Sequence, residues 1–152
     1  MYPVYRLLSF IINSIAFLLA VSVIFSIPLL FSSSATMLSA FIMLAVILYS
    51  WFSFQFRRQV LQKREVVRHT LKDWVRVNGI VTLIFCFMTI ISVTSLLQNP
   101  QSFTSALKGI GLEVPLKSIT GLFYGMLVYA VLLFVHILWT FSLMKKNQEF
   151  FQ

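Results

Sequence analysis

The sequence has little charge. Only 11% of its 152 residues are charged and 59% are hydrophobic, whereas a soluble domain typically carries about 25% charged residues. A chain of this composition cannot cover its surface in water, and the solvent that fits it is the hydrocarbon of a bilayer. The scarcity of charge therefore excludes an ordinary soluble domain and predicts a membrane protein, with one domain at this length.

Cysteine and acidic residues are also scarce. Cys86 is the only cysteine, so the chain can form neither an intramolecular disulfide nor a multi-cysteine metal site. Its four acidic residues are too few to assemble a metal-dependent site. The sequence contains no Gly-x-Ser-x-Gly elbow, no glycine-rich phosphate loop, and no serine or cysteine with an evident base. We predict no catalytic residue, no metal and no cofactor, and expect that the protein is not an enzyme.

Long apolar runs occupy most of the chain. Four of them have about the length of a membrane-spanning helix, which needs ~20 apolar residues. A very short turn at 32–35 joins the first two runs, so these two spans must be antiparallel neighbours. We predict an all-α fold, a single transmembrane domain over 1–152 built from four helices in two antiparallel hairpins. The expected spans are 7–31, 36–54, 80–97 and 119–144.

The first run has one alternative interpretation. Ser32, Ser33, Ser34 and Ala35 resemble a cleavage region, which would make 7–31 a signal peptide. That run is longer than the 7–15 residues of a typical signal-peptide core, so a spanning helix is favoured.

Most of the basic residues gather between the second and third spans. The segment 55–78 holds seven of the twelve Lys and Arg residues, namely Arg57, Arg58, Lys63, Arg64, Arg68, Lys72 and Arg76. One continuous helix over this segment would be ~35 Å long at 1.5 Å per residue, whereas neighbouring helices pack ~8–10 Å apart. We therefore predict that the chain reverses near 68–70, after the second helix has projected beyond the membrane. A flat amphipathic helix on the lipid surface is the alternative.

The remaining Lys and Arg residues predict the orientation. Arg6, Lys145 and Lys146 fall on the same side as the basic segment, whereas only Lys108 and Lys117 fall on the other. By the positive-inside rule, both termini and the loop 55–78 are expected in the cytoplasm. The outer loop is expected over 98–118, with a short surface helix from Pro100 to Lys108 closed by Gly109. Short loops and the absence of a targeting peptide favour a bacterial inner membrane.

Aromatic residues mark the expected membrane boundaries. Tyr5 near the first span, and Tyr49 and Trp51 in the second, are expected at the membrane–water interface, where such rings are enriched. The C-terminal pair Phe150 and Phe151 is expected on the same interface.

The basic loop has two expected ligands. It lies between apolar runs, where anionic headgroups attract Lys and Arg, so we expect it to bind anionic membrane lipid or an acidic segment of a protein partner. The same placement argues against nucleic acid.

Within the spans, weakly polar residues follow single helix faces. No Asp, Glu, Lys or Arg lies in the four apolar cores, which argues against ion-coupled transporters and proton pumps but not against a channel lined by hydroxyls. The stripes predict faces turned to the interior of a four-helix bundle. They comprise Ser9, Asn13, Ala16 and Ala20 in the first span, Thr82, Cys86 and Thr89 in the third, and Gly121, Gly125, Leu132, His136 and Thr140 in the fourth.

His136 is the one ionisable nitrogen expected within the bilayer. From the expected inner boundaries it lies ~12 Å deep, Asn13 ~9 Å and Cys86 ~10 Å, at 1.5 Å per residue. Ser50 and Thr82 lie somewhat shallower, and these five residues form a candidate polar cluster. We favour a neutral histidine hydrogen-bonded to Asn13 or to a hydroxyl, because an unpaired polar group in hydrocarbon costs several kcal/mol. A polar constriction in a small transporter or channel subunit is the alternative.

Gly121 and Gly125 form a GxxxG pattern. Such pairs let helix backbones approach closely. They predict a packing contact, either within the chain or with a second copy or another protein.

The sequence carries no signature of a particular family. The hypothesis that fits the lack of chemistry is a non-enzymatic accessory or scaffold subunit, which packs through its helices and binds lipid or a partner through the basic loop. A small transporter or channel subunit is the alternative, and a membrane enzyme acting on lipid or a redox carrier is the third.

Overall fold

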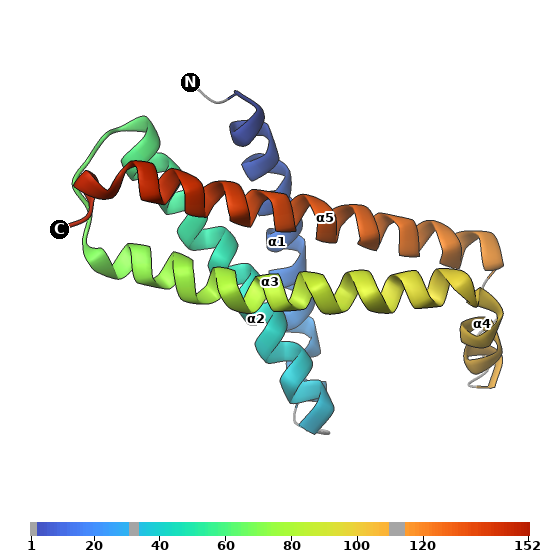
Figure 1. Cartoon of the computed structure of the whole chain (residues 1–152). Coiled ribbons are helices and arrows are strands. Elements are labelled where there is room, and N and C mark those ends of the chain that lie inside the picture. Colours follow the sequence, from blue (N-terminus) through green and yellow to red (C-terminus); the bar gives the residue numbers. More distant parts are fainter. Residues whose placement is uncertain (1–2, 31–33, 110–114) are drawn as a thin grey trace. The chain divides into compact units, whose positions relative to one another are not determined.

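The computed structural model describes residues 3–30, 34–109 and 115–152, and these ranges are almost entirely helical (Figure 1). The expected helical fold is confirmed. In chain order the elements are α1 (Pro3–Leu30), α2 (Ser34–Phe56), the π-helical turn η1 (Arg57–Gln62), α3 (His69–Gln98), α4 (Pro100–Gly109), α5 (Leu116–Lys146) and the 3-10 turn η2 (Gln148–Phe150).

Four helical segments are long and apolar enough to cross a membrane: Pro3–Phe25, Thr36–Gln62, His69–Gln98 and Leu116–Lys146. They coincide with the four apolar runs, so four spanning-competent helices could be identified from hydropathy alone. The possible cleavage region at 32–35 falls at the boundary of α1 and α2, and residues 31–33 lie outside the described part.

The chain divides into two compact units. Unit 1 consists of Met1–Leu83 and Val135–Gln152, and unit 2 of Ile84–Phe134. The division falls inside α3 and α5, so each of these helices contributes one half to each unit.

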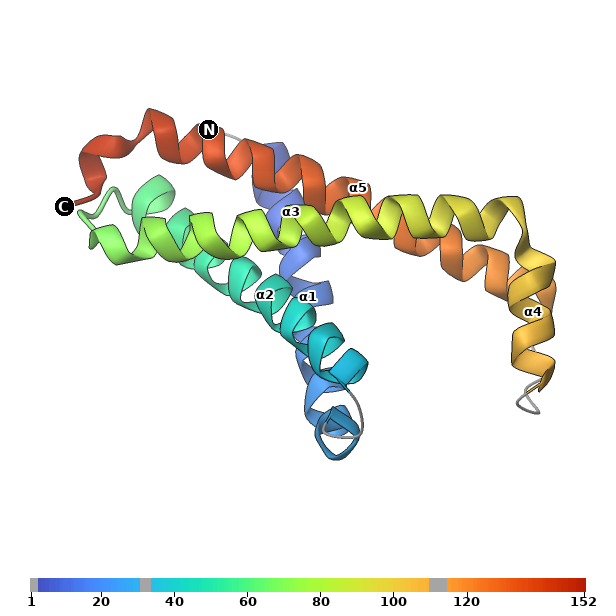
Figure 2. The same cartoon turned by 60° about the horizontal axis from the view of Figure 1, so that its bottom comes forward.

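In unit 1, α1 and α2 lie side by side in both views (Figures 1 and 2). Ile12 and Ala16 of α1 and Ala45 and Val46 of α2 are buried. Small side chains allow helix backbones to approach, and this packing replaces the hydrophobic effect as a source of association energy in lipid.

A glycine brings α3 close to its neighbours in unit 1. A Cβ added at Gly79 would lie 2.7 Å from the Phe141 ring of α5 and 3.4 Å from the Tyr49 ring of α2. The first separation is shorter than real Cβ contacts, whereas the second is ordinary van der Waals contact. The absence of a side chain at Gly79 therefore allows the Phe141 ring to pack against the backbone of α3.

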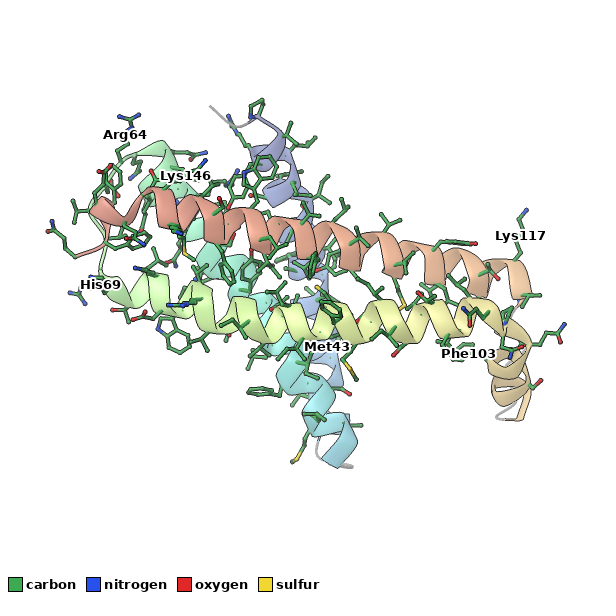
Figure 3. All side chains as sticks on the ribbon, viewed as in Figure 1. Met43, Arg64, His69, Phe103, Lys117 and Lys146 are labelled. Atoms are coloured by element: carbon green, nitrogen blue, oxygen red, sulfur yellow. The ribbon has the colours of Figure 1, made fainter. Side chains whose placement is uncertain are left out.

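Unit 2 has a small core of its own. Val93 of α3 and Ile119 and Phe123 of α5 are buried together. Phe103 of α4, labelled in Figure 3, packs its ring edge-on against Phe123 with centroids 5.3 Å apart. The surface helix expected from Pro100 is confirmed as α4, and one aromatic side chain attaches it to this core.

The basic segment folds back earlier than expected. The helix of α2 continues as η1 to Gln62, and α3 begins at His69. The reversal therefore lies over 63–68 and not near 68–70, and the alternative of one flat amphipathic helix is not formed. Arg64 has a φ of 53°, a left-handed conformation that costs a non-glycine residue roughly 1–2 kcal/mol.

The C-terminal tail holds the reversal in place. Val67 donates its backbone N–H to the Phe150 carbonyl at 2.8 Å, Gln152 donates to the Val67 carbonyl at 3.0 Å, and His69 donates to the Gln152 carbonyl at 3.0 Å. Figures 1 and 2 both show the tail beside this loop.

The side chain of Phe151 is part of this attachment. It is buried and stacks on Phe56 with ring centroids 6.0 Å apart. The expectation that Phe151 lies on the membrane interface is therefore wrong. The backbone pairing of the tail with Val67 turns this ring inward, and hydropathy alone does not reveal that pairing.

We predict that Phe151→Ala loosens the loop. Removing a buried phenylalanine ring costs about 3–5 kcal/mol, and part of that loss should appear as local opening of the tail. Because ~1.4 kcal/mol is a factor of ten in an equilibrium constant, the amides of Val67 and His69 should exchange with solvent at least about tenfold faster, as measured by hydrogen–deuterium exchange. Phe150→Ala is the control, since the Phe150 ring is only half-buried. Equal exchange in both variants would show that the ring does not hold the tail.

Candidate functional site

Five polar side chains meet in the interior of unit 1, and we call them the polar hub. They are Tyr5 and Ser9 of α1, Tyr49 of α2, and His136 and Thr140 of α5. Tyr5 and Ser9 are four residues apart, as are His136 and Thr140, and this spacing places the two side chains of each pair on one helix face. The hub therefore joins three helices through polar contacts.

Both ring nitrogens of His136 are hydrogen-bonded. Its Nε2 lies 2.9 Å from Ser9 Oγ, and its Nδ1 lies 2.9 Å from the Tyr49 hydroxyl. The Thr140 hydroxyl donates to the His136 carbonyl at 2.8 Å and accepts from the Tyr49 hydroxyl at 3.1 Å. The Tyr5 and Thr140 hydroxyls lie 3.0 Å apart.

These contacts fit one arrangement of protons. Thr140 has a single hydroxyl proton, which goes to the His136 carbonyl, so Tyr5 and Tyr49 must both donate to Thr140. The Tyr49 oxygen then accepts from His136 Nδ1–H, and His136 Nε2 accepts from Ser9. The neutral Nδ1–H tautomer of His136 satisfies every one of these bonds, and no charge is required.

Aromatic stacking completes the hub. The Tyr5 ring lies parallel to the His136 ring, with centroids 5.0 Å apart and planes at 4°. The Tyr49 ring meets His136 edge-on at 5.9 Å, and Trp139 meets Tyr5 edge-on at 5.5 Å. The His136 side chain is only 1% exposed. Such a group in hydrocarbon needs partners supplied by the protein, and the hub supplies them.

The expected cluster of Asn13, Ser50, Thr82, Cys86 and His136 is distributed differently. The sequence predicts that His136 is hydrogen-bonded to Asn13 or to a hydroxyl. The structure shows hydroxyl partners on both ring nitrogens. Asn13 is half-buried and borders a hollow next to Phe54 and Arg57. The Thr82 hydroxyl donates to the Asn78 carbonyl of its own helix at 2.7 Å. Ser50 Oγ is buried and has no partner among the described residues.

Cys86 is a free, buried thiol of α3 in unit 2. The five residues of the hub all belong to unit 1.

Sequence reasoning assigned Tyr5 and Tyr49 to the membrane interface. Both are buried, with Tyr49 at 0% exposure. The signal that could have identified Tyr5 is the spacing of polar side chains: Tyr5 and Ser9 share one face of α1, as His136 and Thr140 share one face of α5. Hydroxyl pairs at this spacing are typical of an inward face.

The GxxxG glycines lie on an exposed part of α5 in unit 2. Gly121 and Gly125 are both exposed, and a Cβ added at either would meet none of the described atoms within 4 Å. They make no close helix contact within the described chain.

The basic side chains of the loop are mostly exposed. Arg58, Lys63, Arg64, Arg68 and Arg76 are exposed, and Arg57 and Lys72 are half-buried. Figure 3 shows Arg64 projecting away from the ribbon. In the part of the chain that the structure describes, the one ion pair joins Lys63 to Glu65 at 3.1 Å, and Lys72 lies over the Phe151 ring at 5.8 Å.

No group of three or more His, Cys, Asp or Glu residues that could hold a metal occurs within 3–30, 34–109 and 115–152. Comparison of the chain with protein-family models, with curated proteins and with solved structures gives no match in any of the three. What the site can do must therefore be argued from its own geometry.

We predict that His136→Phe destabilises unit 1 by about 1–3 kcal/mol, the usual cost of leaving buried polar partners unsatisfied. Ser9 and Tyr49 would each lose a ring nitrogen. Unfolding in lipid bicelles by increasing SDS measures the change. Tyr124→Phe is the control, because Tyr124 is exposed and surface changes usually stay within about 0.5 kcal/mol. A His136→Phe protein as stable as the unmodified chain would show that the hub does not hold the helices.

Proposed function

We propose that this chain is a non-enzymatic accessory subunit of a cell membrane, which binds the anionic headgroups of the cytoplasmic leaflet through its basic loop. The observation that carries this proposal is an uncompensated positive charge on a folded loop. Residues 55–78 and 145–152 together hold nine Lys and Arg residues and three acidic residues, an excess of six positive charges. A loop whose shape is fixed by the C-terminal tail presents that charge as a defined surface.

The size of the charge is sufficient for surface binding. Each Lys or Arg near an anionic membrane surface contributes about 1 kcal/mol, and the attraction falls off within a Debye length. Arg58, Arg64, Arg68 and Arg76 are exposed, and we call these four arginines the basic surface. Four such residues would contribute about 4 kcal/mol, enough to concentrate anionic lipid around the protein.

The orientation follows from the same charges. With both termini and the basic surface in the cytoplasm, Lys108 and Lys117 are the Lys and Arg residues that remain on the opposite side. The positive-inside rule supports this arrangement for short loops. A bacterial inner membrane is the compartment that we propose.

The alternative is a small transporter or channel subunit with a polar constriction near Asn13 and His136. It requires water or solute to reach His136. The side chain of His136 is 1% exposed and is bonded on both nitrogens, which supports a structural role for the hub and favours the accessory function.

The test is lipid selectivity in proteoliposomes of phosphatidylglycerol and phosphatidylcholine, measured with spin-labelled forms of each lipid. We predict a preference for phosphatidylglycerol that falls as salt is raised, because salt screens exposed charges. Replacing Arg68 and Arg76 with Gln should reduce the preference. The matched double variant Lys108→Gln and Lys117→Gln should leave the preference unchanged in the leaflet on the side of the basic loop. Equal preference in all three proteins would contradict the proposal.

A further inference from the structure

The N-terminal end of α1 and the turn η1 enclose a hollow in unit 1. Its volume is about 570 Å³, and its lining includes Tyr5, Arg6, Phe10, Arg57 and Leu61. Two arginines, Arg6 and Arg57, are among its lining residues, and no acidic residue is. Two like charges at one hollow repel each other unless an anion lies between them. The hollow therefore has the charge of an anion site and a partly apolar wall.

Arg57 occupies a special position in this hollow. It is half-buried, its guanidinium carbon lies 5.1 Å from the centre of the Phe54 ring, and its Nε is buried with no hydrogen-bond partner among the described residues. It is also the first residue of η1, and π-helical turns frequently occur at functional sites because they redirect side chains. The terminal N–H groups of this guanidinium are the donors that an oxyanion ligand in the hollow would use.

A second hollow adjoins the first along α1 and α2. Its volume is about 490 Å³ and its lining includes Asn13, Phe17, Leu18 and Phe54. Phe10 and Arg57 line both hollows, so the two hollows are neighbours at these residues. The first hollow is charged, whereas the second is mostly aromatic and aliphatic.

The part of α1 that lines the two hollows rises by about the thickness of one lipid leaflet. From Arg6 to Phe17 the helix rises ~16 Å at 1.5 Å per residue. Half of a ~30 Å hydrocarbon core is ~15 Å. A charged end and an apolar tail separated over this distance are the features of one phospholipid, with its headgroup at the interface.

We propose that α1 and α2 of unit 1 bind a single anionic phospholipid. Arg6 and Arg57 hold its phosphate, and one acyl chain lies against Phe10, Phe17 and Phe54. Arginine suits this role because its planar fork donates two parallel hydrogen bonds to phosphate oxygens. A zwitterionic lipid fits less well, because the first hollow contains no carboxylate to pair with an ammonium headgroup.

This lipid site rests on the membrane orientation of the proposed function, but the residues that form it differ from those of the basic surface. The basic surface consists of Arg58, Arg64, Arg68 and Arg76, which attract many lipids without fixed positions. The site at Arg6 and Arg57 holds one lipid in one position. An experiment can therefore contradict either proposal without contradicting the other.

The test is native mass spectrometry of the delipidated full chain in detergent, titrated with dioleoylphosphatidylglycerol or dioleoylphosphatidylcholine. We expect one phosphatidylglycerol molecule to bind at least tenfold more tightly than phosphatidylcholine. The double variant Arg6→Gln and Arg57→Gln should lose this preference, and Arg57→Lys should weaken it, because lysine keeps the charge but not the fork. Arg68→Gln with Arg76→Gln is the matched control and should retain the single tight lipid.

Two competitors separate the lipid from simpler anions. Inorganic phosphate at millimolar concentration and oleate should each displace phosphatidylglycerol poorly, since neither combines a phosphate with an acyl chain. Displacement by phosphate alone would show a free-anion site and overturn the proposal, as would equal binding of both lipids or unchanged binding in the Arg6 and Arg57 double variant. Helix content and elution volume, compared with those of the unmodified chain, verify that each variant is folded.

The outcomes distinguish this site from the basic surface. Loss of spin-label selectivity in the Arg68 and Arg76 variant, with the single tight lipid retained, supports both proposals. If the Arg68 and Arg76 variant instead retained spin-label selectivity while the Arg6 and Arg57 variant lost the tight lipid, the results would support the site and contradict the basic surface.

Discussion

The fold of unit 1 depends on satisfying buried polar groups without water. His136 brings two ring nitrogens into the interior, and Ser9 and Tyr49 bond both of them. In hydrocarbon an unpaired group of this kind costs several kcal/mol, so the side chains that satisfy it also fix the register of the helices that carry them. An uncharged hydrogen-bond network therefore joins α1, α2 and α5. Apolar packing alone would fix their register less well because it is weakly directional.

The same constraint organises the end of unit 1 that carries the basic loop. Charged side chains are costly to bury in an apolar interior, so most of them are exposed on η1, on the reversal and on the first turns of α3. The backbone bonds between Val67 and the tail, together with the buried Phe151 ring, give that charge a fixed framework. The hub, the tail and the proposed phosphate site all lie in unit 1.

Hydropathy predicted most of the architecture but only part of the site. The four apolar runs could be identified because a span must match the thickness of the bilayer core, and the helix beginning at Pro100 could be identified from its proline and glycine ends. His136 could be singled out because it is an isolated ionisable group, and a hydroxyl partner was anticipated. Tyr49 could not be placed, because a tyrosine near a span end suits the interface and the interior equally well. The position of the reversal depends on backbone pairing with Phe150 and Gln152, distant in sequence.

The most direct measurement is solid-state NMR of the protein in lipid bilayers with labelled histidine and tyrosine, in a His69→Gln background so that His136 is the single labelled ring. The account predicts through-space contacts from the His136 ring to both Tyr5 and Tyr49, one protonated ring nitrogen at Nδ1, and no contact with water. A His136 ring in contact with water and lacking either tyrosine contact would contradict the account, because the helices would then be held by something other than the hub.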